Sequence, residues 1–228
     1  MNKNVLIIGG CGFIGRNLAL KLFDEGFEVT IFDKNVSLDG VDENVKNKIK
    51  NNLKIVSGDI LNYNDLIQVI KDKEIVFHFG AIKGITDSNL NPIKTTEVNV
   101  LGTVNILEAC RKCNIKKFIF ASSLYATSNY WGGFYATSKI SCELFIERYN
   151  IEFGLNYIIL RYGSVYGRDA GEVNRIIQMI YNAINKKEIS YALNVSRDFI
   201  HIQDATNLVI NILKNDRYLN KKVNIKGN

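Results

Sequence analysis

A glycine-rich loop between a short apolar run and a helical pattern constrains the fold of this chain more than any other feature. Residues 4–8 form an apolar run that is typical of a buried strand. The loop Gly9-Gly10-Cys11-Gly12-Phe13-Ile14-Gly15 follows at once, and residues 17–23 then repeat apolar side chains at helical spacing. Glycines let the backbone approach a pyrophosphate closely, and the start of a helix offers free N–H groups to it. The stretch therefore predicts the opening unit of a dinucleotide-binding fold.

The second expected strand, residues 28–32, ends at Asp33. An acidic residue roughly twenty positions past such a loop binds the adenosine ribose hydroxyls. A carboxylate there would also repel the 2′-phosphate of NADP, so we expect NAD as the cofactor. Lys34 follows and keeps NADP as an alternative, because a basic side chain can pair with that phosphate.

Strand-like and helical patterns alternate through the first 162 residues. The expected strands after residue 33 are 53–57, 74–79, 118–121 and 156–161, and the expected helices are 64–71, 93–112 and one that contains Tyr135. Residues 34–52 are polar and predict a loop, with a short helix as an alternative. The alternation indicates an α/β fold, a doubly wound parallel sheet (Rossmann fold) with right-handed crossovers. Ligands of such sheets lie at the carboxyl ends of the strands.

The pattern loosens after residue 162. The expected elements there are a helix at 173–186, strands at 188–193 and 197–202, a helix at 204–214 and a last strand at 223–225. We therefore predict a dinucleotide-binding domain over residues 1–162. Residues 163–228 are predicted to form a small or truncated substrate-binding region that caps and interleaves with the sheet.

Composition excludes several classes of function. With 46% hydrophobic and 23% charged residues, the chain is expected to be an ordinary cytoplasmic globular protein, and no apolar run predicts a membrane span or a signal peptide. The net charge of +6 comes from scattered lysines without an arginine-rich stripe, so nucleic acid is not an expected partner. Cys110 and Cys113 have metal-ligand spacing, but no second pair follows and His78 and His201 lie far away, so no metal site is expected.

Tyr135 and Lys139 are four residues apart in an expected helix, so both side chains can reach one site. A free tyrosine has a pKa near ~10 and is a poor base at neutral pH. A neighbouring lysine cation is expected to lower that pKa and make the pair a general acid/base. The spacing alone occurs by chance in many helices, so the interpretation depends on the other motifs.

Taken together, the motifs resemble the extended short-chain dehydrogenase/reductase family, in its NAD-dependent nucleotide-sugar epimerase/dehydratase branch. The residues that carry the resemblance are Gly9-x-x-Gly12-x-x-Gly15, Asp33, Gly58-Asp59-Ile60, His78-Phe79-Gly80-Ala81, Asn99-Val-Leu-Gly-Thr103, Ser122-Ser123, Tyr135-x-x-x-Lys139, Leu160-Arg-Tyr-Gly-Ser-Val-Tyr-Gly167 and Arg197-Asp-Phe-Ile-His201. They occur in the family's order and span nearly the whole chain.

The resemblance implies a role for each matching residue. The implied NAD-binding residues are Gly9, Gly12, Phe13, Ile14, Gly15, Asp33, Lys34, Asp59, Ile60, Phe79, Gly80, Ala81, Lys83, Asn99, Tyr135, Lys139 and Tyr162. Tyr135 would be the acid/base, Lys139 would bind the nicotinamide ribose, and Ser123 would hydrogen-bond the reacting sugar oxygen, with Ser122 as the alternative. Arg197 would bind the substrate diphosphate, and Ser164 stands where the family has an asparagine near that diphosphate.

Departures from the family pattern narrow the expected chemistry. Leu124 and Tyr125 occupy the positions of the Asp-Glu pair that serves 4,6-dehydratases, so dehydration by that route is disfavoured. We expect an epimerase acting on a nucleotide sugar. The alternatives are an NAD(P)-dependent sugar or uronate dehydrogenase or reductase and a non-catalytic NAD-binding protein. The resemblance also implies a homodimer, with Leu144, Phe145 and Tyr149 as positions that serve either the dimer or the core.

Overall fold

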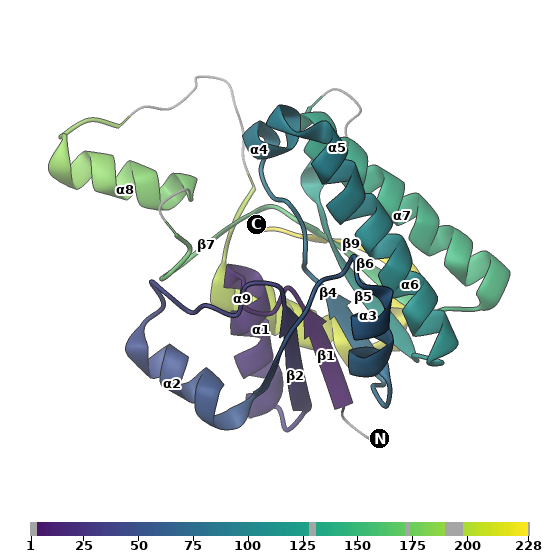
Figure 1. The fold of residues 1–228 in the computed structure, drawn as a ribbon. Helices are drawn as coiled ribbons and strands as arrows, with labels where there is room; N and C mark the ends of the chain where they lie inside the picture. Colours follow the sequence, from purple (N-terminus) through teal and green to yellow (C-terminus); the bar gives the residue numbers. More distant parts are fainter. Residues whose placement is uncertain (1–3, 128–130, 172–173, 190–197, 228) are drawn as a thin grey trace.

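A seven-stranded parallel sheet forms the centre of the fold (Figure 1). The computed structural model describes residues 4–127, 131–171, 174–189 and 198–227. In chain order the strands are β1 (Asn4–Ile8), β2 (Glu28–Asp33), β3 (Lys54–Ser57), β4 (Ile75–His78), β5 (Lys117–Ser123), β6 (Tyr157–Tyr162) and β9 (Lys221–Ile225). Their order in space is β3-β2-β1-β4-β5-β6-β9. The predicted doubly wound α/β fold is confirmed.

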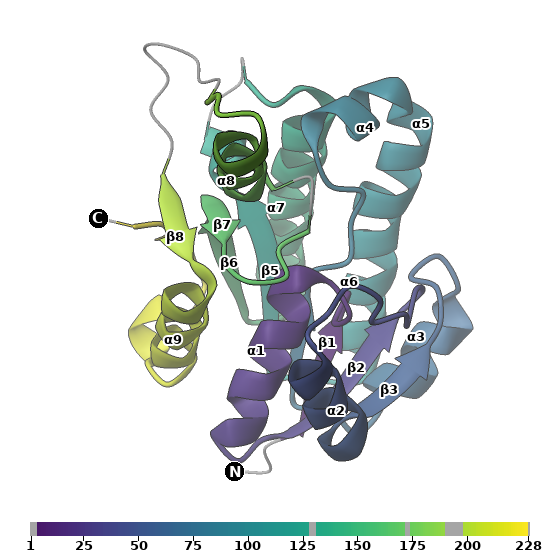
Figure 2. The ribbon, with the colours of Figure 1, turned by 90° about the vertical axis from the view of Figure 1, so that its left-hand side faces the viewer.

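Helices cover both faces of this sheet (Figure 2). One layer holds α1 (Phe13–Asp24), α2 (Glu43–Asn52) and α9 (Ile202–Leu213), and the other holds α3 (Tyr63–Ile70), α6 (Gly102–Lys112) and α7 (Gly133–Phe153). Alternate residues of a strand serve opposite layers: Val5 and Ile7 pack with the first layer, and Leu6 and Ile8 with the second. Burial on both faces explains why these strands are continuous apolar runs in the sequence.

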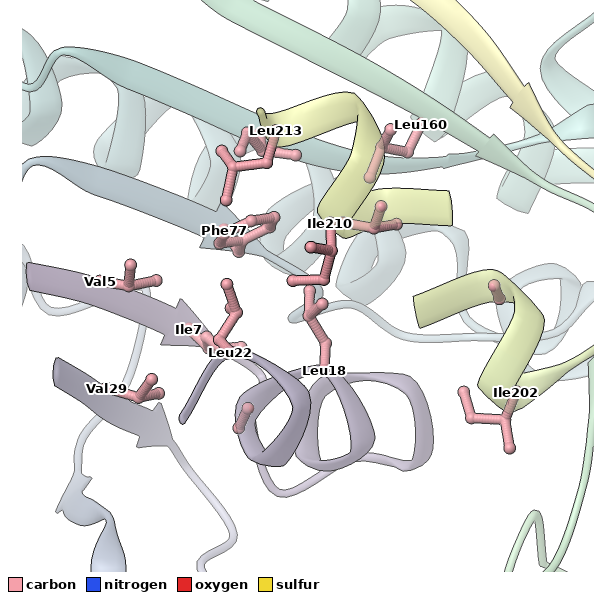
Figure 3. Packing of buried hydrophobic residues seen from close by; sticks show 14 of the residues in the cluster. Val5, Ile7, Leu18, Leu22, Val29, Phe77, Leu160, Ile202, Ile210 and Leu213 are labelled. Atoms are coloured by element: carbon pink, nitrogen blue, oxygen red, sulfur yellow. The ribbon is translucent and has the colours of Figure 1, made fainter. Parts of the chain in front are cut away.

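The core of the first layer joins segments that are far apart in the sequence (Figure 3). Leu18 and Leu22 of α1 belong to the same buried cluster as Ile210 and Leu213 of α9. Each of these side chains is at most 6% exposed. Helix α9, near the end of the described residues, is therefore part of the same core as α1.

The long helix expected at residues 93–112 is interrupted. The structure has α4 (Ile85–Leu90), which was not predicted, then α5 (Pro92–Thr95), a π-helical turn η1 (Thr96–Leu101) and α6. Such turns are often found at functional sites. Asn99, one of the predicted site residues, lies within η1 and is buried.

The region after residue 162 contributes a second small sheet and the last strand of the main one. Two short strands, β7 (Ser164–Tyr166) and β8 (Phe199–His201), pair in parallel. The remaining elements are η2 (Leu124–Thr127), α8 (Arg175–Asn185) and η3 (Asp216–Tyr218). Most of the strand expected at residues 188–193 lies outside the described residues.

The sequence predicts neither a membrane span nor a metal site. Within the described part of the chain, no helix is both long enough and apolar enough to cross a bilayer. Among the same residues, no group of three or more His, Cys, Asp or Glu side chains is placed to hold a metal ion.

Candidate active site

The glycine loop passes against the end of β4 with no room for side chains. A Cβ on Gly9 would lie 2.4 Å from the backbone nitrogen of Gly80, and Gly9 has a positive φ of 76°. A Cβ on Gly15 would lie 2.5 Å from the Gly9 carbonyl oxygen. The helix α1 then begins at Phe13 and has no acidic residue in its first turn. The loop therefore presents a glycine cradle and a helix N-terminus to the carboxyl edge of the sheet.

Asp33 lies at the end of β2 with its carboxylate held by the backbone. Its Oδ2 accepts a hydrogen bond from the Cys11 N–H at 3.0 Å, and its Oδ1 accepts one from the Asn35 N–H at 3.0 Å. The adjacent Lys34 is exposed, and its Nζ lies 2.7 Å from Asp59 Oδ2. The hydrogen bond from Lys34 lowers the pKa of Asp59. The structure thus brings Asp33, Lys34 and Asp59 together beside the glycine loop.

Ser123 and Tyr135 meet where β5 and α7 converge. The Ser123 hydroxyl lies close enough to the Tyr135 phenol to lower its pKa, and Ser123 is 7% exposed. Its Oγ also accepts the Tyr125 N–H at 3.2 Å. A serine hydroxyl and a phenol in contact at this edge of the sheet can both address one substrate hydroxyl.

The expectation that Lys139 lowers the pKa of Tyr135 is wrong for this arrangement. Burial raises the pKa of Tyr135 to about 12, the bond from Ser123 opposes that rise, and the Tyr125 phenol adds to it. The Lys139 Nζ is directed elsewhere, because it donates to the Ala121 carbonyl oxygen at 2.8 Å. That Nζ lies 5.9 Å from the centre of the Tyr135 ring, and burial lowers the pKa of Lys139 to about 8.

Asn99 connects the chain that follows β4 to the helix that carries Tyr135. Its Oδ1 accepts the Ile82 N–H at 2.7 Å, and its Nδ2 donates to the Ile82 carbonyl at 3.1 Å. The same Nδ2 donates to Ser138 Oγ at 3.0 Å, and that hydroxyl donates to the Tyr135 carbonyl at 2.7 Å. The amide therefore fixes the first turn of α7 relative to residues 79–83.

The other predicted site residues lie around this centre or outside the described residues. Phe79 follows β4, and its ring centre lies 6.2 Å from that of Tyr162, whose pKa is raised by burial. Lys83 is exposed. Ser164 begins β7 and donates its N–H to the Asp198 carbonyl at 2.7 Å. Arg197 lies outside the described residues.

His78, which the sequence analysis kept out of the site, is a core residue. It is 1% exposed, and its Nε2 lies 3.0 Å from Thr103 Oγ1. The rings of Phe118 and Phe120 pack against it, at 6.3 and 5.6 Å between ring centres. Burial, with a smaller contribution from the Lys139 charge, lowers the pKa of His78 to about 3, so the imidazole is neutral.

The sequence did not predict the roles of two residues beside Tyr135. Ser138 bonds both Asn99 and the Tyr135 backbone, and Tyr125 lies close enough to affect the pKa of Tyr135. Ser138 could have been noticed because it is within one helical turn of Tyr135. The sequence marked Tyr125 only as a departure from the dehydratase pattern, because its approach to Tyr135 depends on the path of η2.

Comparisons with known proteins agree with this geometry. Residues 5–225 match the model of the NAD dependent epimerase/dehydratase family. A putative UDP-glucose 4-epimerase of Methanocaldococcus jannaschii is 34% identical, over 88% of this chain and 70% of that protein. The CDP-paratose 2-epimerase of Salmonella typhi is 31% identical, over 92% of this chain and 75% of that protein.

Solved structures give the same result. The UDP-N-acetylglucosamine 4-epimerase of Methanobrevibacter ruminantium M1, solved with UDP-N-acetylmuramic acid, superposes with a TM-score of 0.84. It is 30% identical, and the match covers 99% of this chain and 76% of that one. The similar proteins also include a UDP-N-acetyl-alpha-D-glucosaminuronate decarboxylase of Bacillus cytotoxicus, 33% identical over 73% of this chain and 56% of that protein.

Proposed function

Since this chain belongs to the NAD dependent epimerase/dehydratase family, we propose that it is an epimerase that inverts a hydroxyl-bearing carbon of a nucleotide sugar. The observation that carries the proposal is the placement of the Ser123 hydroxyl beside the Tyr135 phenol at the carboxyl ends of the strands. The glycine cradle opens at the same edge of the sheet. A cofactor site and a proton-transfer group are therefore adjacent, as hydride-transfer chemistry requires.

The residues present fit NAD. The pyrophosphate would lie on the glycine cradle and the first turn of α1, where a Cβ on Gly9 or Gly15 would collide with backbone. Asp33, already held by two backbone N–H groups, would bind the adenosine ribose. The proposed NAD-binding set is Gly9, Gly12, Phe13, Ile14, Gly15, Asp33, Lys34, Asp59, Ile60, Phe79, Gly80, Ala81, Lys83, Asn99, Tyr135, Lys139 and Tyr162. NAD is favoured over NADP because the ammonium of Lys34 is paired with Asp59.

When bound, NAD supplies the hydride acceptor and donor. The chain supplies the proton chemistry: Tyr135 takes the proton of the sugar hydroxyl and returns it, while Ser123 hydrogen-bonds the reacting oxygen. A phenol whose pKa is about 12 needs a nearby positive charge to act as a base at neutral pH. Lys139, one helical turn away, does not supply that charge in this arrangement, and its proposed role is to bind the nicotinamide ribose.

The substrate-binding region is proposed to be residues 163–228, with Ser164 and Arg197 near the substrate diphosphate. The similar proteins named above act on UDP- and CDP-linked sugars by their names, which favours a nucleotide sugar as the substrate class. Leu124 and Tyr125 follow Ser123 in place of carboxylates, which argues against dehydration. A dehydrogenase or reductase with an exchangeable cofactor is the alternative.

We also propose a homodimer through α7. Leu144 and Phe145 are 61% and 42% exposed on this helix, so they are not part of the core. Tyr149 is half-buried, and its hydroxyl lies 3.4 Å from Glu108 Oε2 of α6. Two neighbouring exposed apolar side chains on a long helix are a surface that a second copy of the chain could cover.

The test is to measure retained NAD and the interconversion of nucleotide sugars by the purified protein. Tyr135→Phe is expected to reduce kcat by about 10²-fold or more, because general acid–base catalysis is lost. Tyr149→Phe is the matched control, since it removes a phenol from the same helix but far from Ser123. An epimerase keeps its NAD and forms no net NADH. Net NADH formation with an exchangeable cofactor would support the dehydrogenase, and full turnover by Tyr135→Phe would reject the catalytic assignment.

A further inference from the structure

A row of polar side chains along α7 faces the sheet where apolar residues would be expected. Tyr135, Lys139, Glu143 and Glu147 follow one another at four-residue intervals, so they lie on one face of the helix. Lys139 and Glu143 are 3% and 2% exposed. Charged residues are almost never this buried unless they are paired. The row therefore serves a purpose other than packing.

The Glu143 carboxylate has hydrogen-bond or ion-pair partners on three neighbouring strands. Its Oε1 accepts the Ser122 hydroxyl at 2.6 Å and the Arg161 Nε at 2.9 Å. Its Oε2 accepts the Arg161 Nη2 at 2.6 Å and lies 3.4 Å from the Lys222 Nζ. Ser122, Arg161 and Lys222 belong to β5, β6 and β9. The pairing with Arg161 is bidentate, which fixes the planes of both groups.

Glu143 is ionised in this setting. Burial raises the pKa of Glu143, but the bonds from Arg161 and Ser122 and the charges of Arg161 and Lys222 together lower it below its ordinary value. The carboxylate is one helical turn from Lys139 and acts against the burial that lowers the pKa of that lysine. Cys142 acts in the same direction, but its own pKa is raised by burial, so at neutral pH it is an uncharged thiol.

The same carboxylate distinguishes the two serines at the end of β5. Ser122 is hydrogen-bonded to Glu143, while its neighbour Ser123 lies beside Tyr135. Ser122 and Ser123 are adjacent at the end of β5, so the bond from Ser122 to Glu143 also fixes the backbone from which the Ser123 side chain extends.

We propose that Glu143 is a positioning residue of the active site, acting through Lys139 and Ser122. Its negative charge keeps Lys139 as an ammonium, and its hydrogen bond to Ser122 sets the end of β5 so that Ser123 faces Tyr135. The proposal rests on the proposed function for its catalytic meaning. Its electrostatic part can be measured without turnover.

Other titratable groups near this pair must be counted in the test. The groups that act on Lys139 or Glu143, or on their neighbour Lys222, are Tyr135, Cys142 and Glu147 on α7, His78 on β4, Arg161 and Tyr157 on β6, and Lys222 itself on β9. Glu147 offers a matched control. Its Oε1 lies 2.9 Å from the same Lys222 Nζ, but it is 33% exposed and one turn farther from Lys139.

The direct experiment is an NMR titration of Lys139 in protein labelled with ¹³C at the lysine ε-carbon, with Lys139→Arg used for assignment. In the wild type we expect a midpoint of about 8. Glu143→Gln is expected to lower the midpoint by about one pH unit, since a neighbouring opposite charge is lost. Glu147→Gln is expected to leave the midpoint in place. An unchanged midpoint in Glu143→Gln, or an equal shift in Glu147→Gln, overturns the proposal.

Glu143→Gln leaves Arg161 without its buried partner and is expected to fold less stably. The double variant Glu143→Gln/Arg161→Gln removes both charges, so it is expected to recover stability. Loss of the Arg161 cation itself raises the midpoint of Lys139, so the double variant is compared with Arg161→Gln alone. A lower midpoint in the double variant supports the electrostatic role, and equal midpoints refute it. The double variant also carries the test if Glu143→Gln does not fold.

The pH dependence of turnover is the second measurement. In Glu143→Gln the limb of the kcat profile that reports Lys139 is expected to move to lower pH with the NMR midpoint, while KM changes less than kcat. Glu143→Asp keeps the charge and is expected to recover most of the pH profile. If Glu143→Gln shifts the NMR midpoint but the wild type converts no nucleotide sugar, the proposed function is rejected and the coupling between Glu143 and Lys139 is retained. An active enzyme with an unshifted profile in Glu143→Gln would reject this inference alone.

Discussion

The buried imidazole of His78 predicts how the stability of this protein depends on acid. The folded protein holds His78 neutral, because burial lowers its pKa from 6.5 to about 3. The unfolded chain binds a proton at the ordinary value. Between these two pKa values the unfolded state therefore binds more protons than the folded state. The stability that the neutral His78 contributes at pH 7 is therefore lost as the pH falls from the unfolded-state pKa to the folded-state pKa.

The magnitude follows from the width of the interval. Each pH unit below 6.5 costs about 1.4 kcal/mol of unfolding free energy until the folded-state pKa is reached. At pH 5 the loss attributable to His78 is therefore about 2 kcal/mol, and it approaches about 5 kcal/mol near pH 3. Total stabilities of about 5–15 kcal/mol make this a large fraction. His78 is 1% exposed, so solvent screening reduces the effect little.

Urea unfolding of the wild type and His78→Gln at pH 7.5, 6 and 5 measures this contribution. The glutamine keeps a polar group opposite Thr103 but does not titrate. The stability difference between the two proteins is expected to change by about 2 kcal/mol between pH 7.5 and 5, in favour of the variant at the lower pH. Phe118→Leu, which disturbs packing beside the imidazole, is the control and is expected to show a deficit that does not vary with pH. Parallel pH dependences in the wild type and His78→Gln would refute the reasoning.

Three further substitutions test the cradle and the proposed dimer. Gly15→Ala places a Cβ 2.5 Å from the Gly9 carbonyl oxygen, so we expect a lower Tm and a loss of NAD binding measured by calorimetry. Gly12→Ala is the control and is expected to have a smaller effect, because its Cβ would lie 3.3 Å from the same oxygen. Binding of NAD at wild-type affinity by Gly15→Ala would contradict the proposed position of the pyrophosphate. Leu144→Asp is expected to convert a dimer into a monomer in sedimentation velocity with little change in Tm, and a monomeric wild type would rule out the dimer.

The parts of the fold that depend on local pattern could be predicted from the sequence. The strands of a parallel sheet are buried on both faces, so β1, β2, β4, β5 and β6 are readable as apolar runs. The glycine loop was informative because its neighbours, a strand and a helix, were recognisable too. Convergence of the site residues at one edge follows from the parallel arrangement itself.

The parts that depend on contacts across the fold could not be predicted. Apolar spacing in residues 93–112 does not reveal the π-helical turn at Asn99, because the turn is supported by bonds to Ile82 and Ser138. Whether the pKa of Tyr135 is raised or lowered depends on how deeply its hydroxyl is buried, and residue spacing does not reveal that burial. Glu143 looked like an ordinary helix residue because its partner Lys222 lies on the last strand.

The place of β9 in the sheet has a consequence for how the protein is made. Lys221–Ile225 pairs along β6, and α9 supplies side chains to the core shared with α1. A nascent chain that has emerged from the ribosome only as far as Tyr162 therefore has an open strand edge and an uncovered apolar face. Such edges are prone to pair with other chains. The stretch of synthesis between residues 162 and 225 is thus the interval in which a chaperone would matter most for this protein.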